Sequence, residues 1–211
     1  MPEISIQSTV RDLNLHLWEM SESMEWFASR TILTPPENLE LESMMGKRRK
    51  EFIVQRFLLQ QHFGDALPIL RKTRNGKPFL VNQSEKISIT HSKSMLMLST
   101  APVEHGIDLE WLDGRIVRLA DKFCNESEKQ VPHYTDAAFW YTVIWSCKEA
   151  LYKVDGLGQL DFRSQLAVHF TPSSFDQGWG RGMVRRQDKT LFFRLYFCEI
   201  NGFVATWAYP I

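Results

Sequence analysis

At residues 145–153 the chain reads Trp-Ser-Cys-Lys-Glu-Ala-Leu-Tyr-Lys, inside a run from Phe139 that contains no proline or glycine. Apolar residues recur through this run at steps of three and four, the period of a helix with one buried face. They are Trp140, Val143, Ile144, Cys147 and Leu151. Gly156 and Gly158 follow and are expected to end the helix.

A second stripe on the same helix consists of Trp145, Glu149 and Lys153, which are spaced four apart. The simplest interpretation of Glu149 and Lys153 is an exposed ion pair, which stabilises a helix by roughly 0.2–0.5 kcal/mol. Another interpretation follows from carboxylates that stand about forty residues earlier in the chain.

The earlier stretch, residues 105–111, reads His-Gly-Ile-Asp-Leu-Glu-Trp, and its alternation of apolar with acidic residues predicts a half-buried strand. Asp108 and Glu110 then project from one face, with their backbone positions roughly 6.5–7 Å apart. On most alternating strands such a face is simply solvated. If Glu149 lies alongside, however, three carboxylates make an oxygen site that suits magnesium. Lys153 would then supply a cation where phosphate charge builds up.

These residues resemble the 4′-phosphopantetheinyl transferase superfamily. Its signature is a Gly-Ile-Asp-x-Glu strand followed some forty residues later by Trp-Ser-x-Lys-Glu-Ala/Ser-x-x-Lys, and both stand here, at residues 106–110 and 145–153. A third element, Gly-Lys-Pro followed by a Ser/Thr-His-Ser strand end, matches residues 76–78 and 90–92. The motifs occur in the family's order and spacing, and the resemblance covers nearly the whole chain.

The resemblance implies an α+β fold of two similar halves related by a pseudo-twofold axis, as in the family's longer, broad-specificity members. We expect a first half over residues 1–104, which contacts the nucleotide phosphates. The second half, over residues 105–211, is expected to carry the metal site and the catalytic helix. A faint internal echo between residues 15–19 and 107–111 agrees with such a repeat.

The activity implied by the resemblance is that of a 4′-phosphopantetheinyl transferase of the holo-[acyl-carrier-protein] synthase type. Such an enzyme moves the 4′-phosphopantetheine arm of coenzyme A to a serine of an apo acyl or peptidyl carrier protein and releases 3′,5′-ADP. Magnesium is the expected metal, with manganese as the alternative. The identity of the carrier protein and its pathway stays open.

The resemblance also assigns roles to individual residues. The metal is expected to bind Asp108, Glu110 and Glu149. Glu149 would also accept the serine proton, directly or through a water, and Lys153 would steady the leaving phosphate. The nucleotide's phosphates are expected to contact Lys77, Thr90, His91, Lys148 and one arginine of the first-half helix, which is Arg48, Arg49 or Arg56.

Composition disfavours several other classes of protein. Lys+Arg and Asp+Glu number 25 each, so the formal net charge is zero, which disfavours a protein built to grip a nucleic-acid backbone. Cys124, Cys147 and Cys198 are odd in number and too widely spaced for a disulfide framework or a zinc site. No charged-then-apolar leader opens the chain, and no apolar run approaches 18 residues. We therefore expect a cytoplasmic protein without a nucleic-acid or membrane partner, and the family's broad-specificity branch adds the expectation of a monomer.

Two other functions compete with this one. A magnesium-dependent phosphodiesterase or nuclease also uses acidic residues with a lysine, but in that site the final Glu and Lys lie two apart on a strand. Here they lie four apart on a predicted helix. A non-catalytic module that binds coenzyme A or a carrier protein would not need the three acidic residues and their lysine.

The rest of the sequence predicts the remaining elements. A helix is expected at residues 20–33, ended by Pro35-Pro36, and another at 47–63, closed by Gly64, with Met45, Phe52, Leu59 and Phe63 facing inward. A further helix is expected at residues 115–123. Strands are expected at residues 13–18, 87–92, 95–99 and 167–170, and a hairpin joins residues 191–200 and 203–208 at Asn201-Gly202.

Overall fold

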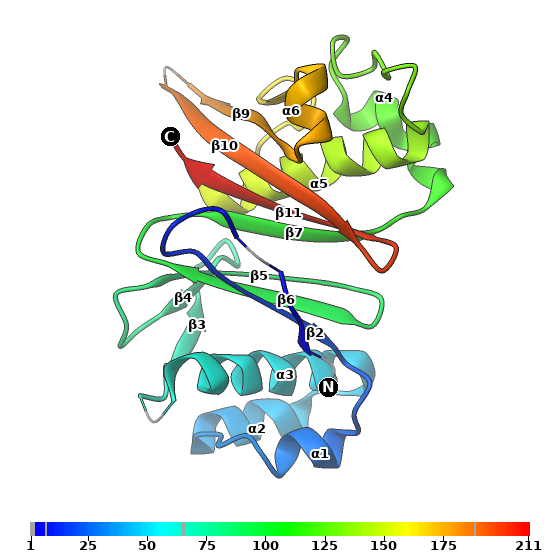
Figure 1. The fold of residues 1–211 in the computed structure, drawn as a ribbon. Coiled ribbons are helices and arrows are strands. Elements are labelled where there is room, and N and C mark those ends of the chain that lie inside the picture. The colour runs from blue at the N-terminus through cyan, green and yellow to red at the C-terminus, as the bar shows by residue number, and fades with distance from the viewer. Residues whose placement is uncertain (1–2, 7, 65, 188) are drawn as a thin grey trace.

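The computed structural model describes residues 3–6, 8–64, 66–187 and 189–211. Two antiparallel sheets face each other in the middle of the molecule, and helices cover the outer face of each sheet (Figure 1). The mixed α and β architecture agrees with the predicted α+β class. Within the described part of the chain, no helix is long and apolar enough to cross a membrane.

The first half contains a four-stranded sheet in the order β1-β2-β6-β5. Its strands are β1 (Glu3–Ile4), β2 (Asn14–Glu19), β5 (Lys86–Ser92) and β6 (Met95–Ala101). The helices on its outer face are α1 (Met24–Ala28), α2 (Pro35–Ser43) and α3 (Gly46–Phe63). A separate two-stranded ribbon consists of β3 (Leu70–Lys72) and β4 (Pro78–Leu80).

The second half contains a five-stranded sheet in the order β7-β11-β10-β9-β8. Its strands are β7 (Gly106–Trp111), β8 (Leu166–His169), β9 (Trp179–Arg186), β10 (Lys189–Ile200) and β11 (Phe203–Pro210). Its helices are the 3-10 helix η1 (Gly114–Leu119), α4 (Ala120–Phe123), α5 (Ala137–Asp155) and α6 (Pro172–Asp176).

The chain passes from the first sheet to the second between Ala101 and Gly106. The two sheets differ in strand number, four against five, although each carries one long helix, α3 or α5. The division at residue 104 and the pseudo-twofold axis therefore stay predictions.

Strand β7 is covered on both of its faces. Ile107 and Leu109 belong to the apolar cluster between the two sheets. Asp108 points to the opposite side, toward α5, and is only 3% exposed. Of the two interpretations of this face, a solvated one does not hold for Asp108, because α5 packs over it.

The expected helix at residues 20–33 was also wrong in its extent. Only α1 forms there, and Pro35-Pro36 begins α2 instead of ending a helix. Proline is tolerated in the first turn because an amide there has no partner within the helix. Thr34 precedes the prolines, and its backbone amide donates to the Glu37 carboxylate at 3.0 Å. Met45 precedes α3 and is 87% exposed, so its expected inward position was wrong as well.

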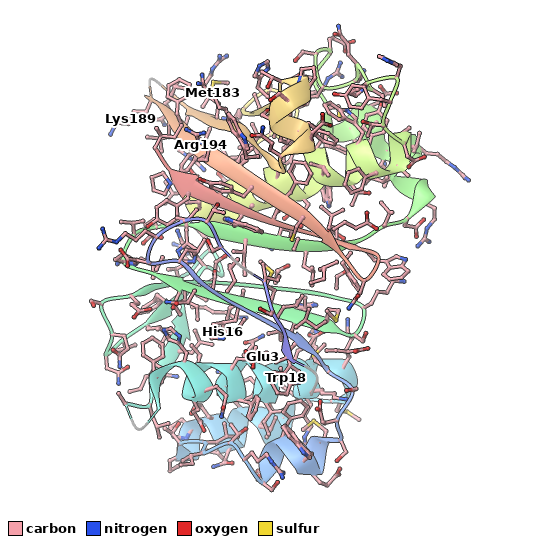
Figure 2. The ribbon with its side chains drawn as sticks, in the orientation of Figure 1. Glu3, His16, Trp18, Met183, Lys189 and Arg194 are labelled. Atoms are coloured by element: carbon pink, nitrogen blue, oxygen red, sulfur yellow. The ribbon has the colours of Figure 1, made fainter. Side chains whose placement is uncertain are left out.

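The C-terminal hairpin is confirmed. Asn201 and Gly202 both adopt positive φ, at 51° and 78°, as a two-residue hairpin turn requires. Strand β9, which pairs with β10, was not expected, and Figure 2 places Met183, Lys189 and Arg194 on this pair. The same view shows Glu3, His16 and Trp18 in the first half, on β1 and β2.

Candidate active site

Two edge strands from different sheets, β5 and β7, are joined through side-chain hydroxyls. Ser88 and Ser92 of β5 accept hydrogen bonds from backbone amides of β7, at 3.1 and 3.3 Å. Between them, Thr90 Oγ1 donates to Asp108 Oδ1 at 3.1 Å. Since alternate residues of a strand share a face, these three hydroxyls form one row that fixes where Asp108 lies. Thr90, which was expected to contact nucleotide phosphates, is engaged with this carboxylate.

Helix α5 approaches β7 at Gly106. A Cβ atom on Gly106 would lie 2.0 Å from the carbonyl oxygen of Ala150, so glycine is required for this approach. The close packing brings Ser146 Oγ of α5 to 2.9 Å from Asp108 Oδ2. Ser146 is itself held by Thr206 Oγ1 of β11, at 3.0 Å.

The third partner of Asp108 is charged. Lys153 Nζ lies 2.7 Å from Asp108 Oδ1, and the lysine side chain is about a quarter exposed. Both oxygens of Asp108 are therefore occupied, by two neutral hydroxyls and one ammonium. This bond from the end of α5 was not foreseen from the sequence, where Lys153 was assigned to phosphate.

Glu110 and Glu149 lie next to Asp108 and its partners. Glu110 Oε1 accepts a hydrogen bond from Trp145 Nε1 at 3.0 Å, and burial together with the charge of Asp108 raises the pKa of Glu110. Burial, followed by the charge of Asp108, raises the pKa of Glu149 to about 7, and Lys153 opposes this shift. None of the described residues forms a hydrogen bond with the Glu149 carboxylate. The acidic group, which we define as Asp108, Glu110 and Glu149, thus carries more negative charge than its surroundings neutralise.

The acidic group suits a hard divalent cation by its chemistry. All of its donors are carboxylate oxygens, which magnesium and manganese prefer, and the raised pKa values of Glu110 and Glu149 are what a cation would relieve. Its members are neighbours and not a closed set of ligands. In the described parts of the chain, no three His, Cys, Asp or Glu side chains are gathered closely enough to hold a metal ion.

A cavity of about 220 Å³ opens between the halves beside this group, and Glu149 and Lys153 line it from α5. The turn of residues 75–78 forms the opposite wall. There Lys77 Nζ donates to the carbonyl oxygen of Val154 at 2.8 Å and also contacts Glu104 at 2.6 Å. Lys77, an expected phosphate contact, therefore reaches the cavity and also caps the C-terminus of α5.

A second cavity, of about 480 Å³, lies in the first half and has a basic lining. Its ionisable residues are Glu40, Arg48, Glu51, Arg56, Arg71, Lys72 and His91. Since β5 contributes His91 to this cavity and residues 87–89 to the first one, the two cavities lie along one strand.

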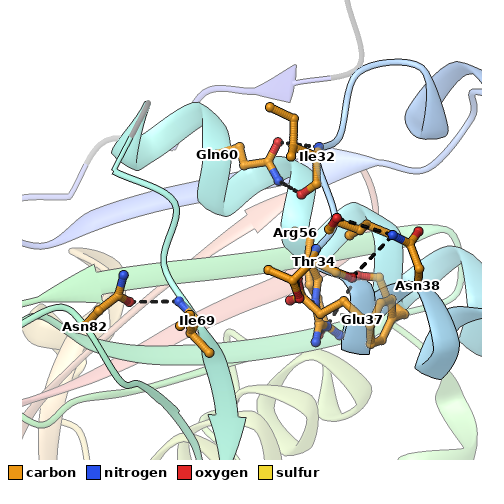
Figure 3. A network of polar contacts seen from close by, with 11 residues as sticks. Ile32, Thr34, Glu37, Asn38, Arg56, Gln60, Ile69 and Asn82 are labelled. Atoms are coloured by element: carbon orange, nitrogen blue, oxygen red, sulfur yellow. Dashed lines mark hydrogen bonds and ion pairs between the residues drawn. The ribbon is translucent and has the colours of Figure 1, made fainter.

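The three candidate arginines of α3 differ in their surroundings. Arg48 lines the basic cavity. Arg56 lines it too, but it is buried and pairs with Glu37 at 3.2 Å (Figure 3). Its guanidinium also stacks on the Phe52 ring. Arg49 is exposed and lines neither cavity. The structure therefore favours Arg48 as the arginine free to meet a ligand.

His91 stands at the rim of the basic cavity. Its Nδ1 lies 3.2 Å from Glu51 Oε1, and burial lowers the pKa of the imidazole, while Glu51 opposes this shift. Glu51 was not singled out from the sequence. Glu51 is buried on α3 and also pairs with the exposed Lys47, at 3.2 Å.

Lys148 does not reach either cavity, which corrects its expected role as a phosphate contact. Its side chain is fully buried, and its ammonium contacts Glu128 at 2.6 Å and the carbonyl oxygens of Phe123 and Phe162 at 2.7 Å each. Burial lowers the pKa of Lys148 and Glu128 opposes that shift. Of the adjacent residues Lys148 and Glu149, the lysine is therefore buried in an internal ion pair and the glutamate lines the cavity.

The raised pKa of Glu149 makes stability depend on pH. Its ordinary value is 4.5 and its value in the folded protein is about 7, so the native state holds the proton more tightly. The associated stability is present below pH 4.5 and is lost as the pH rises toward 7. In chelator-treated protein we expect Glu149→Gln to match the wild type near pH 4.5 and to be more stable by about 1–3 kcal/mol at pH 8. Denaturant unfolding at both pH values checks this, and an equal difference at the two pH values would contradict it.

Comparison with known proteins identifies the family of the chain. No curated protein matches the chain. Residues 104–208, which hold the whole acidic group together with Lys153, match the sequence model of the 4′-phosphopantetheinyl transferase superfamily. The match confirms the resemblance found in the motifs: the chain belongs to the 4′-phosphopantetheinyl transferase superfamily.

Proposed function

We propose that the protein transfers the 4′-phosphopantetheine arm of coenzyme A to a serine of an apo acyl or peptidyl carrier protein and releases 3′,5′-ADP. The observation that carries this proposal is the acidic group with Lys153, two members of which, Glu149 and Lys153, line a cavity between the two halves. A module that only binds coenzyme A has no need of a carboxylate held near neutral pKa beside a lysine.

The acidic group would hold magnesium, with manganese as the alternative. A bound divalent cation supplies neutralisation of the pyrophosphate charge of coenzyme A, so that an oxygen nucleophile can approach the phosphorus. Asp108 is fixed by Thr90 and Ser146 and would be the rigid member of the group. Glu110 lies two residues after Asp108 on β7, and Glu149 lies on α5. The two glutamates would therefore approach the metal from two sides.

Glu149 is the proposed proton acceptor. The serine oxygen forms a bond to the β-phosphorus, its proton passes to the Glu149 carboxylate directly or through a water, and the bond to the bridging oxygen breaks. The leaving group is 3′,5′-ADP. Glu149 lines the cavity, and none of the described residues forms a hydrogen bond with its carboxylate, so an oxygen is available to accept the proton. Lys153 would steady the charge that develops on the leaving phosphate.

The basic residues around the two cavities are the proposed contacts of the nucleotide. Lys77 reaches the cavity between the halves, and Arg48 and His91 line the basic cavity beside it. Phosphate groups favour such sites because arginine and lysine donate charge-assisted hydrogen bonds. A third cavity, of about 340 Å³, opens on the other side of the acidic group and is lined by Glu110 and Trp145. We assign this side to the approaching serine of the carrier protein.

The proposal includes a monomer that works in the cytoplasm without a nucleic-acid or membrane partner. The zero formal net charge supports the absence of a nucleic-acid partner, because such proteins are usually basic. The carrier protein's identity is not part of the proposal.

Incubation with coenzyme A, magnesium and a panel of apo carrier proteins tests the function. Mass spectrometry should show a carrier that gains one phosphopantetheine arm at its serine. Asp108→Ala and Glu149→Gln should each lower the transfer rate more than about 10²-fold, the loss expected when electrostatic stabilisation is removed. Glu42→Gln, an exposed carboxylate of α2, is the matched control and should leave the rate unchanged. Near wild-type transfer by Glu149→Gln would refute its assignment, and DNA cleavage in place of transfer would favour the nuclease alternative.

The adjacent arginines of α3 provide a matched pair for the nucleotide site. Arg48→Ala should raise the KM for coenzyme A by about tenfold, equivalent to the loss of about 1.4 kcal/mol of phosphate binding, with a smaller effect on kcat. Arg49→Ala should change neither constant, because Arg49 is exposed and lines neither cavity. Steady-state kinetics with coenzyme A as the varied substrate measures both, and a larger effect from Arg49 would place the nucleotide on another side of α3.

A further inference from the structure

Lys153 supplies a positive charge to the acidic group from within the chain. Its Nζ lies 2.7 Å from Asp108 Oδ1. The other two partners of Asp108, Thr90 and Ser146, are neutral hydroxyls at 3.1 and 2.9 Å. Among these three contacts, only the one to Lys153 offsets the negative charge of the carboxylates.

Of the three partners of Asp108, Lys153 is the one whose side chain can move away. Thr90 and Ser146 are buried, at 6% and 0% exposure, and both lie within regular elements. The Lys153 side chain is 27% exposed and lines the cavity between the halves. A lysine ammonium on its flexible four-carbon stem can move by several ångströms without any change in the backbone.

The position of Lys153 conflicts with a closed metal site. A divalent cation held by the acidic group would need an oxygen of Asp108 and would lie close to the ammonium, and two like charges repel strongly in a buried setting.

We propose that Lys153 is a built-in counter-ion, which holds Asp108 while no divalent cation is bound and moves from Asp108 into the cavity when one binds. The inference rests on the proposed function for the identity of the cation as magnesium or manganese. The exchange delivers the ammonium to the cavity in which the nucleotide phosphates are proposed to lie. Cation binding would therefore prepare Lys153 for its contact with phosphate.

Competition between Lys153 and the cation predicts how variants bind metal. Lys153→Met removes the competing charge at similar length, so it should bind magnesium or manganese at least about tenfold more tightly than the wild type. Lys153→Arg keeps the charge and should stay within about threefold of the wild type. Lys86→Met makes the same chemical change on an exposed lysine that lines no cavity, and it should not alter the affinity.

Isothermal titration of chelator-treated protein with magnesium chloride or manganese chloride, without coenzyme A, measures these affinities. Thermal unfolding provides a second readout. Lys153→Met should have a lower Tm than the wild type in chelator and a larger rise in Tm when the metal is added, because the metal then replaces the missing charge.

Equal or weaker metal binding by Lys153→Met, or no metal binding by any variant, would overturn the counter-ion role. This result is separable from the fate of the transferase proposal. Transfer to a carrier with unchanged metal affinity in Lys153→Met would retain the function and reject the counter-ion. Tighter metal binding in Lys153→Met without transfer by the wild type would retain the counter-ion and reject the function.

Discussion

The close contact between α5 and β7 is the constraint on which the site depends. Gly106 allows it, because any side chain there would overlap the backbone of α5 at Ala150. Interiors pack densely and do not absorb such an overlap without a shift of a whole element. A displacement of α5 would separate Ser146 and Lys153 from Asp108, and Glu149 would move with them. One glycine in the strand thus determines the distances among groups that are forty residues apart in the chain.

The charges of the site are balanced by partners that come from different elements of the fold. Asp108 is enclosed by two sheets and one helix, so its charge must be met by specific partners. Burial and the charge of Asp108 raise the pKa of Glu149, and Lys153, one turn further along α5, opposes this shift. Lys148 points the other way and neutralises Glu128 inside the second half. Of these two adjacent residues of α5, one is therefore paired in the interior and the other lines the cavity.

Much of this arrangement was predictable, and the failures have physical causes. The period of 3.6 and the glycines after Lys153 predicted α5, and Asn201-Gly202 predicted the last hairpin. Strand β9 was missed because Gly180 and Gly182 fill its buried positions, where Leu151 and Phe170 leave no room for side chains, so the apolar alternation is absent. Arg48 and Arg49 could not be separated by spacing, because the cavity that distinguishes them is built by β3 and β5. The ion pair of Lys153 with Asp108 needed the packed structure, since no local pattern links residues 45 apart.

The central claim is that Asp108, Glu110 and Glu149 together form the binding site of a divalent cation. Anomalous diffraction from crystals grown with manganese and coenzyme A tests it most directly. The account predicts a manganese peak bounded by carboxylate oxygens of Asp108 and at least one of the two glutamates, at about 2.0–2.3 Å. A manganese ion bound elsewhere in the protein, with these three carboxylates pointing apart, would contradict it.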